Sequence, residues 1–239
     1  MKKLPCSLKK ISGMNMILAS SLLAAVLSTW TPAARANLVL QSPTVMVEQS
    51  EGEGTMLVQN KADSPMLMHV DVVNVPEDQE DLILVAPPIT RLDSGDTQLV
   101  RFILKDPGTI KTERFKRATF EGIPKSAANS VQIALRQNIG LVIRPAGLTP
   151  NDTPWKLLKW RNTAQGLSVE NPSPYIVRML EGIKLLPAGT ELLLSKNYLL
   201  PGEKITLPSH APLTDVQKVS FQPASINGFI KATHEATVE

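Results

Sequence analysis

The stretch Val131-Gln-Ile-Ala-Leu-Arg-Gln-Asn-Ile-Gly-Leu-Val-Ile143 decides the fold class of this chain. Its apolar side chains recur at every second position, which is the period of a β-strand with one buried face. We therefore predict one long strand that ends at Arg144-Pro145. The positions that share its apolar face are Val131, Ile133, Leu135, Ile139, Leu141 and Ile143.

Shorter strands are predicted on both sides of this one. They alternate with turn signals such as Leu92-Asp-Ser-Gly-Asp96, and no stretch combines a helical period with helix caps. Short strands with a turn roughly every 8–12 residues indicate an all-β sandwich. The predicted strands cover residues 55–60, 66–73, 82–85, 97–104 and 115–120, and then 155–160, 167–170, 175–180, 191–194, 204–207 and 218–221.

A stretch rich in proline and glycine, Arg144 to Pro154, divides the β pattern into two parts. Such a composition is typical of a linker. The chain is 43% hydrophobic and 20% charged, which is the balance of a folded globular protein. We predict two β-sandwich domains in tandem, with bounds at residues 37–146 and 147–239.

Residues 1–36 have the organisation of a secretory signal peptide. A start rich in lysine precedes an apolar run from Met14 to Leu27, and Pro32-Ala-Ala-Arg-Ala36 ends in small residues. The alternative is a membrane anchor, but the apolar run is shorter than the ~20 residues that span a bilayer. We therefore predict cleavage after Ala36, export, and no insertion into the membrane.

Export changes the charge of the chain. Five of the 25 basic residues lie in residues 1–36 and no acidic residue does, so the remainder has 20 basic and 22 acidic residues and a net charge of −2. This balance does not favour binding to nucleic acid. The only cysteine, Cys6, lies in the predicted signal peptide, so we expect neither a disulfide nor thiol chemistry in the mature protein.

The sequence contains no recognisable catalytic set. The histidines His69, His210 and His234 have no metal-ligand spacing. Asp93-Ser94-Gly95 is similar to the aspartic-protease triplet, but the second carboxylate motif that this chemistry needs is absent, and a turn before a strand explains it better. We expect a binding protein rather than an enzyme, with no cofactor and no metal.

A series of motifs along the chain, taken in order, is similar to that of periplasmic pilus-assembly chaperones, the PapD-like family. No single motif is decisive, but the ordered set is specific. The motifs are Ala86-Pro87-Pro88-Ile89, Phe120 to Pro124, Val131 to Leu135, Ile143-Arg-Pro145, Val169 to Tyr175, Leu199-Leu-Pro-Gly202 and Ser225-Ile-Asn-Gly-Phe229.

This resemblance implies two immunoglobulin-like sandwiches and a non-enzymatic chaperone in the periplasm. Its partners would be pilus subunits, which it caps by donor-strand complementation, and an outer-membrane usher, to which it delivers them. The residues that it would donate are Val131, Ile133, Leu135 and Ile139. The alternative, which the residues alone leave open, is that these side chains pack only into the chain's own core. The loop from Lys125 to Ser130 is similar to that of the short-loop subclass.

The chain departs from the family at the site that anchors the subunit's C-terminal carboxylate. Members usually place an arginine on the first strand and a lysine on the donor strand, where this chain has Pro43 and Gly140. Arg117, which is similar to an arginine of the archaic branch, and Arg136 are the two candidate substitutes, since a guanidinium binds both carboxylate oxygens. Each could instead be a solvated charge at a strand edge.

Glu113 and Arg144 match a structural ion pair of the family near the domain junction, whose third, acidic member is Gly228 in this chain. We expect Glu113 and Arg144 to set the domain angle, in a reduced network.

The alternative function is that of a secreted immunoglobulin-like adhesive surface protein. A secreted hydrolase is a third function class, which the missing catalytic set disfavours. Self-association of the free protein is also open, because an exposed apolar strand favours it.

Overall fold

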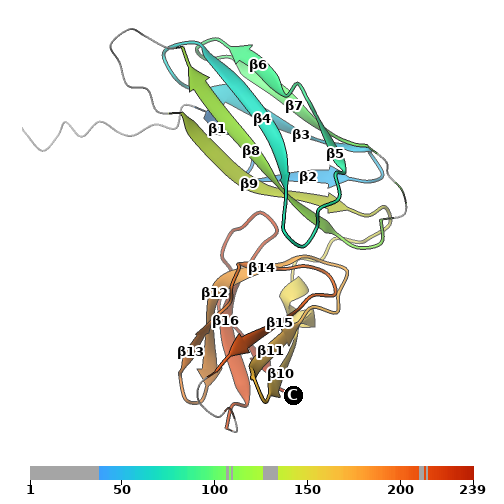
Figure 1. The fold of residues 1–239 in the computed structure, drawn as a ribbon, viewed down its shortest axis with the longest axis vertical. Coiled ribbons are helices and arrows are strands. Elements are labelled where there is room, and N and C mark those ends of the chain that lie inside the picture. Colours follow the sequence, from blue (N-terminus) through green and yellow to red (C-terminus); the bar gives the residue numbers. More distant parts are fainter. Residues whose placement is uncertain (1–37, 106–107, 109, 126–133, 210–212, 214) are drawn as a thin grey trace, which may run out of the picture. The chain divides into compact units, whose positions relative to one another are not determined.

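The computed structural model describes residues 38–239 except 106–107, 109, 126–133, 210–212 and 214 (Figure 1). The predicted signal peptide, with Cys6, and the predicted donor residues Val131 and Ile133 lie outside the described residues. The described residues belong to one compact unit, residues 36–239. No helix among them is long and apolar enough to cross a membrane.

The first sandwich has two layers. One layer orders its strands β5-β7-β3, with β1 also paired to β3, and the other orders them β9-β8-β4-β6. Strand β2 pairs with both layers, antiparallel to β3 and parallel to β9. The strands are β1 (Leu38–Leu40), β2 (Thr44–Glu48), β3 (Glu53–Asn60), β4 (Met66–Asn74), β5 (Ile83–Ala86), β6 (Ile89–Leu92), β7 (Thr97–Leu104), β8 (Arg114–Pro124) and β9 (Leu135–Arg144).

The two layers meet through the apolar face of each strand. In β4, Met66, Met68 and Val70 are buried while the residues between them are more exposed, which is the period-two pattern of the sequence. Phe102 of β7 and Phe120 of β8 meet edge to face in the core, with ring centroids 6.1 Å apart. Burying these apolar faces stabilises the sandwich and holds β8 and β9 in place.

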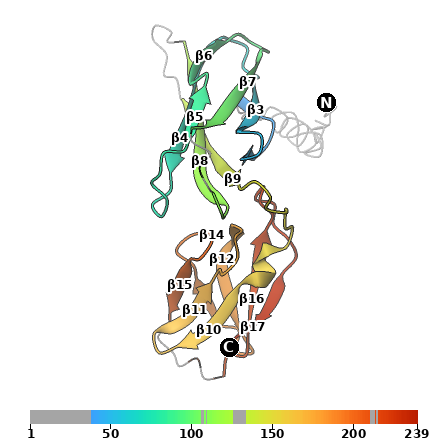
Figure 2. The same ribbon diagram turned by 90° about the vertical axis from the view of Figure 1, so that its right-hand side faces the viewer.

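The second sandwich has one sheet ordered β10-β11-β15 and another ordered β13-β12-β16-β17, with β14 paired to β12 (Figure 2). Trp160 of β10 and Phe221 of β16 pack between the sheets, with ring centroids 5.4 Å apart. The strands are β10 (Lys159–Thr163), β11 (Gly166–Glu170), β12 (Val177–Leu186), β13 (Glu191–Leu193), β14 (Tyr198–Leu199), β15 (Lys204–Pro208), β16 (Lys218–Ala224) and β17 (His234–Thr237).

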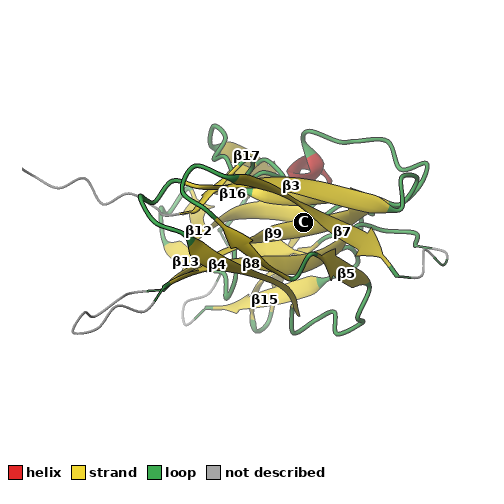
Figure 3. Cartoon of the chain, turned by 90° about the horizontal axis from the view of Figure 1, so that it is seen from above, coloured by secondary structure: helices red, strands yellow, loops and turns green. Residues whose placement is uncertain are grey.

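The predicted all-β class of two immunoglobulin-like sandwiches is confirmed (Figure 3). The predicted strand 155–160 is wrong in its first part, because Pro154–Leu157 forms a 3₁₀ helix, η1, and β10 begins only at Lys159. Pro154 favours this turn, since its fixed φ suits the first residue of a helix and its missing N–H costs nothing there. Asp93-Ser94-Gly95 forms a turn, in which Gly95 has a φ of 86°.

Candidate functional site

One edge of β9 is open along half of its length. The antiparallel neighbour β8 pairs with β9 from Leu135 to Ile143, whereas the parallel neighbour β2 pairs only from Gly140 to Arg144. Along Leu135–Ile139, no strand among the described residues pairs with that second edge. The Gln137 side chain there donates from Nε2 to the Leu38 carbonyl at 2.8 Å. An unpaired edge presents backbone donors and acceptors that an added strand can satisfy.

A groove of about 380 Å³ lies along this open edge. Apolar side chains of β1 form one wall, and Gln137 and Ile139 of β9 form the other. Val39 is 44% exposed there. The groove therefore combines free backbone groups with apolar surface. Its lining residues are Leu38, Val39, Leu40, Gln41, Ser42, Pro43, Gln137 and Ile139.

The face of β9 that carries the predicted donor residues changes from buried to exposed along the strand. Leu141 and Ile143 are fully buried in the chain's own core, Ile139 is half-buried against it, and Leu135 is 51% exposed. The alternative reading, in which the strand faces only its own core, thus holds for Leu141 and Ile143. It does not hold for Leu135, because about half of this residue is exposed to solvent.

The positions of the missing anchor residues lie together in the structure. Thr44, which follows Pro43, is the cross-strand partner of Gly140 on one side, and Arg117 of β8 is its partner on the other. The guanidinium of Arg117 donates from Nε to Asn138 Oδ1 at 2.8 Å and from Nη2 to the Asn138 carbonyl at 3.1 Å. Burial lowers the pKa of Arg117. Arg117 therefore lies beside the position that the family's lysine would occupy.

Arg136, the other anchor candidate, has a different environment. It is exposed, and its Nη2 lies 2.7 Å from Glu121 Oε2, the carboxylate of its cross-strand partner on β8. Four residues of extended strand, about 13 Å, separate it from Gly140. The structure thus does not bring Arg136 to the place where Arg117 and Gly140 meet.

Glu113 and Arg144 do meet, as the resemblance implies. Arg144 Nε donates to Glu113 Oε1 at 3.3 Å, and Arg144 Nη1 lies 3.0 Å from Glu48 Oε1. Glu113 also reaches the second sandwich, since its Oε2 accepts from the Ile176 N–H at 2.9 Å and its N–H donates to the Pro174 carbonyl at 2.8 Å. Burial raises the pKa of Glu113, although the Ile176 N–H and Arg144 oppose the shift.

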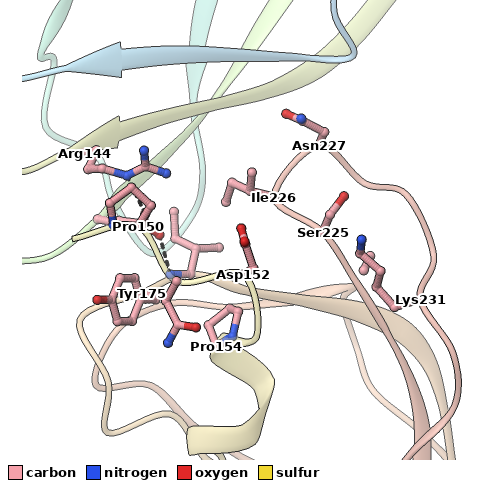
Figure 4. A pocket seen from close by; sticks show the side chains of 13 residues that line it. Arg144, Pro150, Asp152, Pro154, Tyr175, Ser225, Ile226, Asn227 and Lys231 are labelled. Carbon is pink, nitrogen blue, oxygen red and sulfur yellow. Dashed lines mark hydrogen bonds and ion pairs between the residues drawn. The ribbon is translucent and has the colours of Figure 1, made fainter. Parts of the chain in front are cut away.

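Glu48 is the member of this group that sequence reasoning missed. It is the cross-strand partner of Arg144 in the parallel pair of β2 and β9, and only that register reveals it. Beside the group lies a pocket of about 310 Å³, with Arg144, Tyr175 and Asn227 among its lining residues (Figure 4). Gly228, at the place of the family's acidic residue, has a φ of 82°, a backbone conformation that glycine adopts without strain.

Replacing Glu113 with alanine is expected to lower the free energy of unfolding by about 2 kcal/mol, because the buried N–H of Ile176 loses its acceptor. Urea unfolding of the two proteins measures this difference. Glu51→Ala, which removes an exposed carboxylate, is the control and should change stability by less than about 0.5 kcal/mol. Equal stability of the two variants would contradict a structural role for Glu113.

Residues 37–149 match the family described as "Pili and flagellar-assembly chaperone, PapD N-terminal domain". Residues 153–231 match "Pili assembly chaperone PapD, C-terminal domain". The chain belongs to the PapD-like family of pilus-assembly chaperones. The resemblance that the motifs indicated is therefore confirmed for both halves of the chain.

A relative agrees with this membership, and solved structures share the fold. The PapD-like chain is 34% identical to the fimbrial chaperone YhcA of Escherichia coli K12 over 195 aligned residues. These aligned residues cover 80% of this chain and 86% of YhcA. It matches the Pseudomonas aeruginosa CupB2 chaperone with a TM-score of 0.66 at 21% identity, over 84% of this chain and 100% of that one. A chain in the Salmonella enterica complex of SafA pilin with the SafB chaperone matches with a TM-score of 0.67 at 17% identity, over 86% and 98% of the two chains.

Proposed function

We propose that this chain is a periplasmic chaperone that binds, folds and caps pilus subunits by donating β9 as a strand. The observation that carries the proposal is the open edge of β9 at Leu135–Ile139, with the apolar groove beside it. The match to a chain in the solved complex of SafA pilin with the SafB chaperone supports a subunit as the partner.

The physical basis is that the donated strand covers groups that both proteins would otherwise expose. A pilus subunit with an incomplete sandwich would expose an apolar groove and unpaired strand edges, which make it prone to aggregate. A donated strand satisfies the backbone groups, and its alternate side chains fill the groove. We propose Leu135 and Ile139 as two of these side chains. Val131 and Ile133 share their parity and complete the proposed donor set.

The remaining steps of the proposal concern export and delivery. Residues 1–36 would be removed as a signal peptide, leaving the domains 37–146 and 147–239 in the periplasm. The chaperone would then pass its subunit to an outer-membrane usher and catalyse no reaction. Free chaperone could cover its apolar strand by self-association, because exposed apolar surface of this kind favours contact.

We further propose Arg117 as an anchor for the subunit's C-terminal carboxylate. It is the cross-strand partner of Gly140, where the pairing of β9 with β2 begins. Its planar guanidinium suits a carboxylate better than a point charge does.

Purification of the tagged chain from its own periplasm, followed by mass spectrometry of the eluate, tests the proposal. A pilin-like subunit is expected at a one-to-one ratio with the chain. Elution of the chain alone from cells that are assembling pili would contradict the proposal and would favour the adhesive alternative.

A further inference from the structure

Arg178, a residue of the second sandwich, lies against Gly140 of the first. It belongs to β12 and is half-buried, and its Nη1 donates to the Ile226 carbonyl at 2.7 Å. A β-carbon at Gly140 would lie 3.7 Å from this Nη1, and one at Gly228 would lie 3.1 Å from Nη2. The 3.1 Å distance is tighter than an ordinary contact, so Gly228 leaves space that the guanidinium occupies. The 3.7 Å distance is an ordinary contact and places the guanidinium beside Gly140.

Two arginines therefore lie beside Gly140. Arg117 is its cross-strand partner on β8 and bonds through its guanidinium to Asn138, and the guanidinium of Arg178 approaches Gly140 from β12. Burial lowers the pKa of Arg178, and the positive charge of Arg117 lowers it further. The charge of Arg117 therefore acts on Arg178.

No carboxylate of the described residues forms an ion pair with either arginine. Arg117 donates to the amide oxygen and the carbonyl of Asn138, and Arg178 donates to the carbonyl of Ile226. Each guanidinium has five N–H donors, so both keep donors for another ligand. Like charges withdrawn from water and without a counter-charge are unfavourable, and an anion between them removes that cost.

The strand topology indicates what the anion is. The open edge of β9 stops at Gly140, where Thr44 begins the pairing with β2. A strand that adds to Leu135–Ile139 must therefore end or turn away beside Gly140. A chain that ends there presents its terminal carboxylate to the two arginines, and it runs parallel to β9, since β9 also runs toward Gly140.

We propose that Arg178 of the second sandwich joins Arg117 in holding the terminal carboxylate of the bound subunit beside Gly140. The inference rests on the proposed function, because it takes the ligand to be the end of an added strand. It adds a binding residue from the second sandwich, so residues of both sandwiches hold the C-terminal end of the subunit.

The test uses N-acetylglycine, which ends like a peptide, and the neutral N-acetylglycinamide as its control, at constant ionic strength. The carboxylate is expected to raise the Tm of the mature wild-type chain in a saturable way, because it binds only the folded protein. The neutral amide is expected to leave the Tm unchanged. Arg178→Gln and Arg117→Gln should each weaken the binding by at least about tenfold, the loss expected for one charge-assisted hydrogen bond.

Arg136→Gln is the matched control, since it removes an arginine that already has Glu121 as its partner, and it should bind N-acetylglycine as the wild type does. Arg178→Lys keeps the charge and should weaken binding less than Arg178→Gln. Absence of a saturable shift in the wild type, or unchanged binding by both Arg178 variants, would overturn the inference. Because this assay needs no subunit, it separates failure of the anion site from failure of strand donation.

Discussion

Replacing Leu135 with glutamate is expected to abolish the recovery of pilus subunits with the chain. Leu135 is 51% exposed and lies opposite Gly122 on β8, so its loss costs the chaperone's own core little. In the proposed complex the same side chain enters an apolar groove of the subunit. An unpaired carboxylate there costs at least about 3 kcal/mol, which corresponds to a loss in affinity on the order of a hundredfold. Quantitative mass spectrometry of subunits that elute with the tagged chain measures the effect.

Leu84→Glu provides the matched control. Leu84 is 53% exposed on β5, in the other layer of the same sandwich and away from the open edge of β9. The substitution adds the same charge at a leucine of nearly the same exposure. Subunit recovery should match the wild type for Leu84→Glu. Equal losses in the two variants would mean that the glutamate acts through solubility or folding, and strand donation by Leu135 would then be wrong.

Replacing Asp78 with alanine is expected to lower the free energy of unfolding by about 3 kcal/mol, because it leaves a buried charge without its counter-ion. Lys116 of β8 is fully buried, and its Nζ lies 2.9 Å from Asp78 Oδ1. It also donates to the carbonyls of Asp78 and Glu80, both at 2.7 Å, and these bonds do not replace the lost charge. Arg114 loses the same partner, from which its Nε is 2.7 Å away. Urea unfolding at neutral pH measures the change.

The dependence of the free energy of unfolding on pH, measured in acid, gives a second test of the same ion pair. Burial raises the pKa of Asp78, but hydrogen bonds from Arg114 and Lys116 outweigh it and hold the pKa below the ordinary 3.8. A carboxyl with a lowered pKa in the folded state stabilises the protein at neutral pH, and this contribution is lost as the pH falls from the unfolded pKa through the folded one. Asp78→Ala should therefore flatten the pH dependence of stability below about pH 4.

Asp81→Ala is the control for this substitution. Asp81 forms an ion pair with Lys105, and both side chains are well exposed. An exposed pair of this kind contributes less than about 1 kcal/mol. If Asp78→Ala and Asp81→Ala prove equally stable, the buried pair does not hold the segment before β5 against β8 as the structure indicates.

Strand prediction succeeded where burial alternates along the chain. The predicted strand at residues 97–104 is β7 with the same bounds, because its alternation depends only on neighbouring positions. Prediction failed for β2, a short strand that exists through its parallel pairing with β9, far away in the sequence. It also failed at Pro154, where a local turn preference prevailed over an apolar run.

The residues of the candidate site also divide into those that the sequence indicated and those that only the structure revealed. The resemblance named Arg117 as a candidate anchor and Glu113 with Arg144 as an ion pair, and the structure brings that pair within 3.3 Å. Arg178 could not be found in this way. Nothing local distinguishes it from other strand arginines, and its approach to Gly140 depends on how β12 packs.

The sequence by itself determined the all-β class, the parity of the long strand and the family, because each depends on patterns carried by neighbouring residues. Only the tertiary structure decided that β9 is open from Leu135 to Ile139 and closed from Gly140. It also decided that Arg178 lies at the point where the edge closes. Strand pairing and the approach of two charges join segments distant in sequence, so they follow from the packing of the whole chain and not from any local pattern.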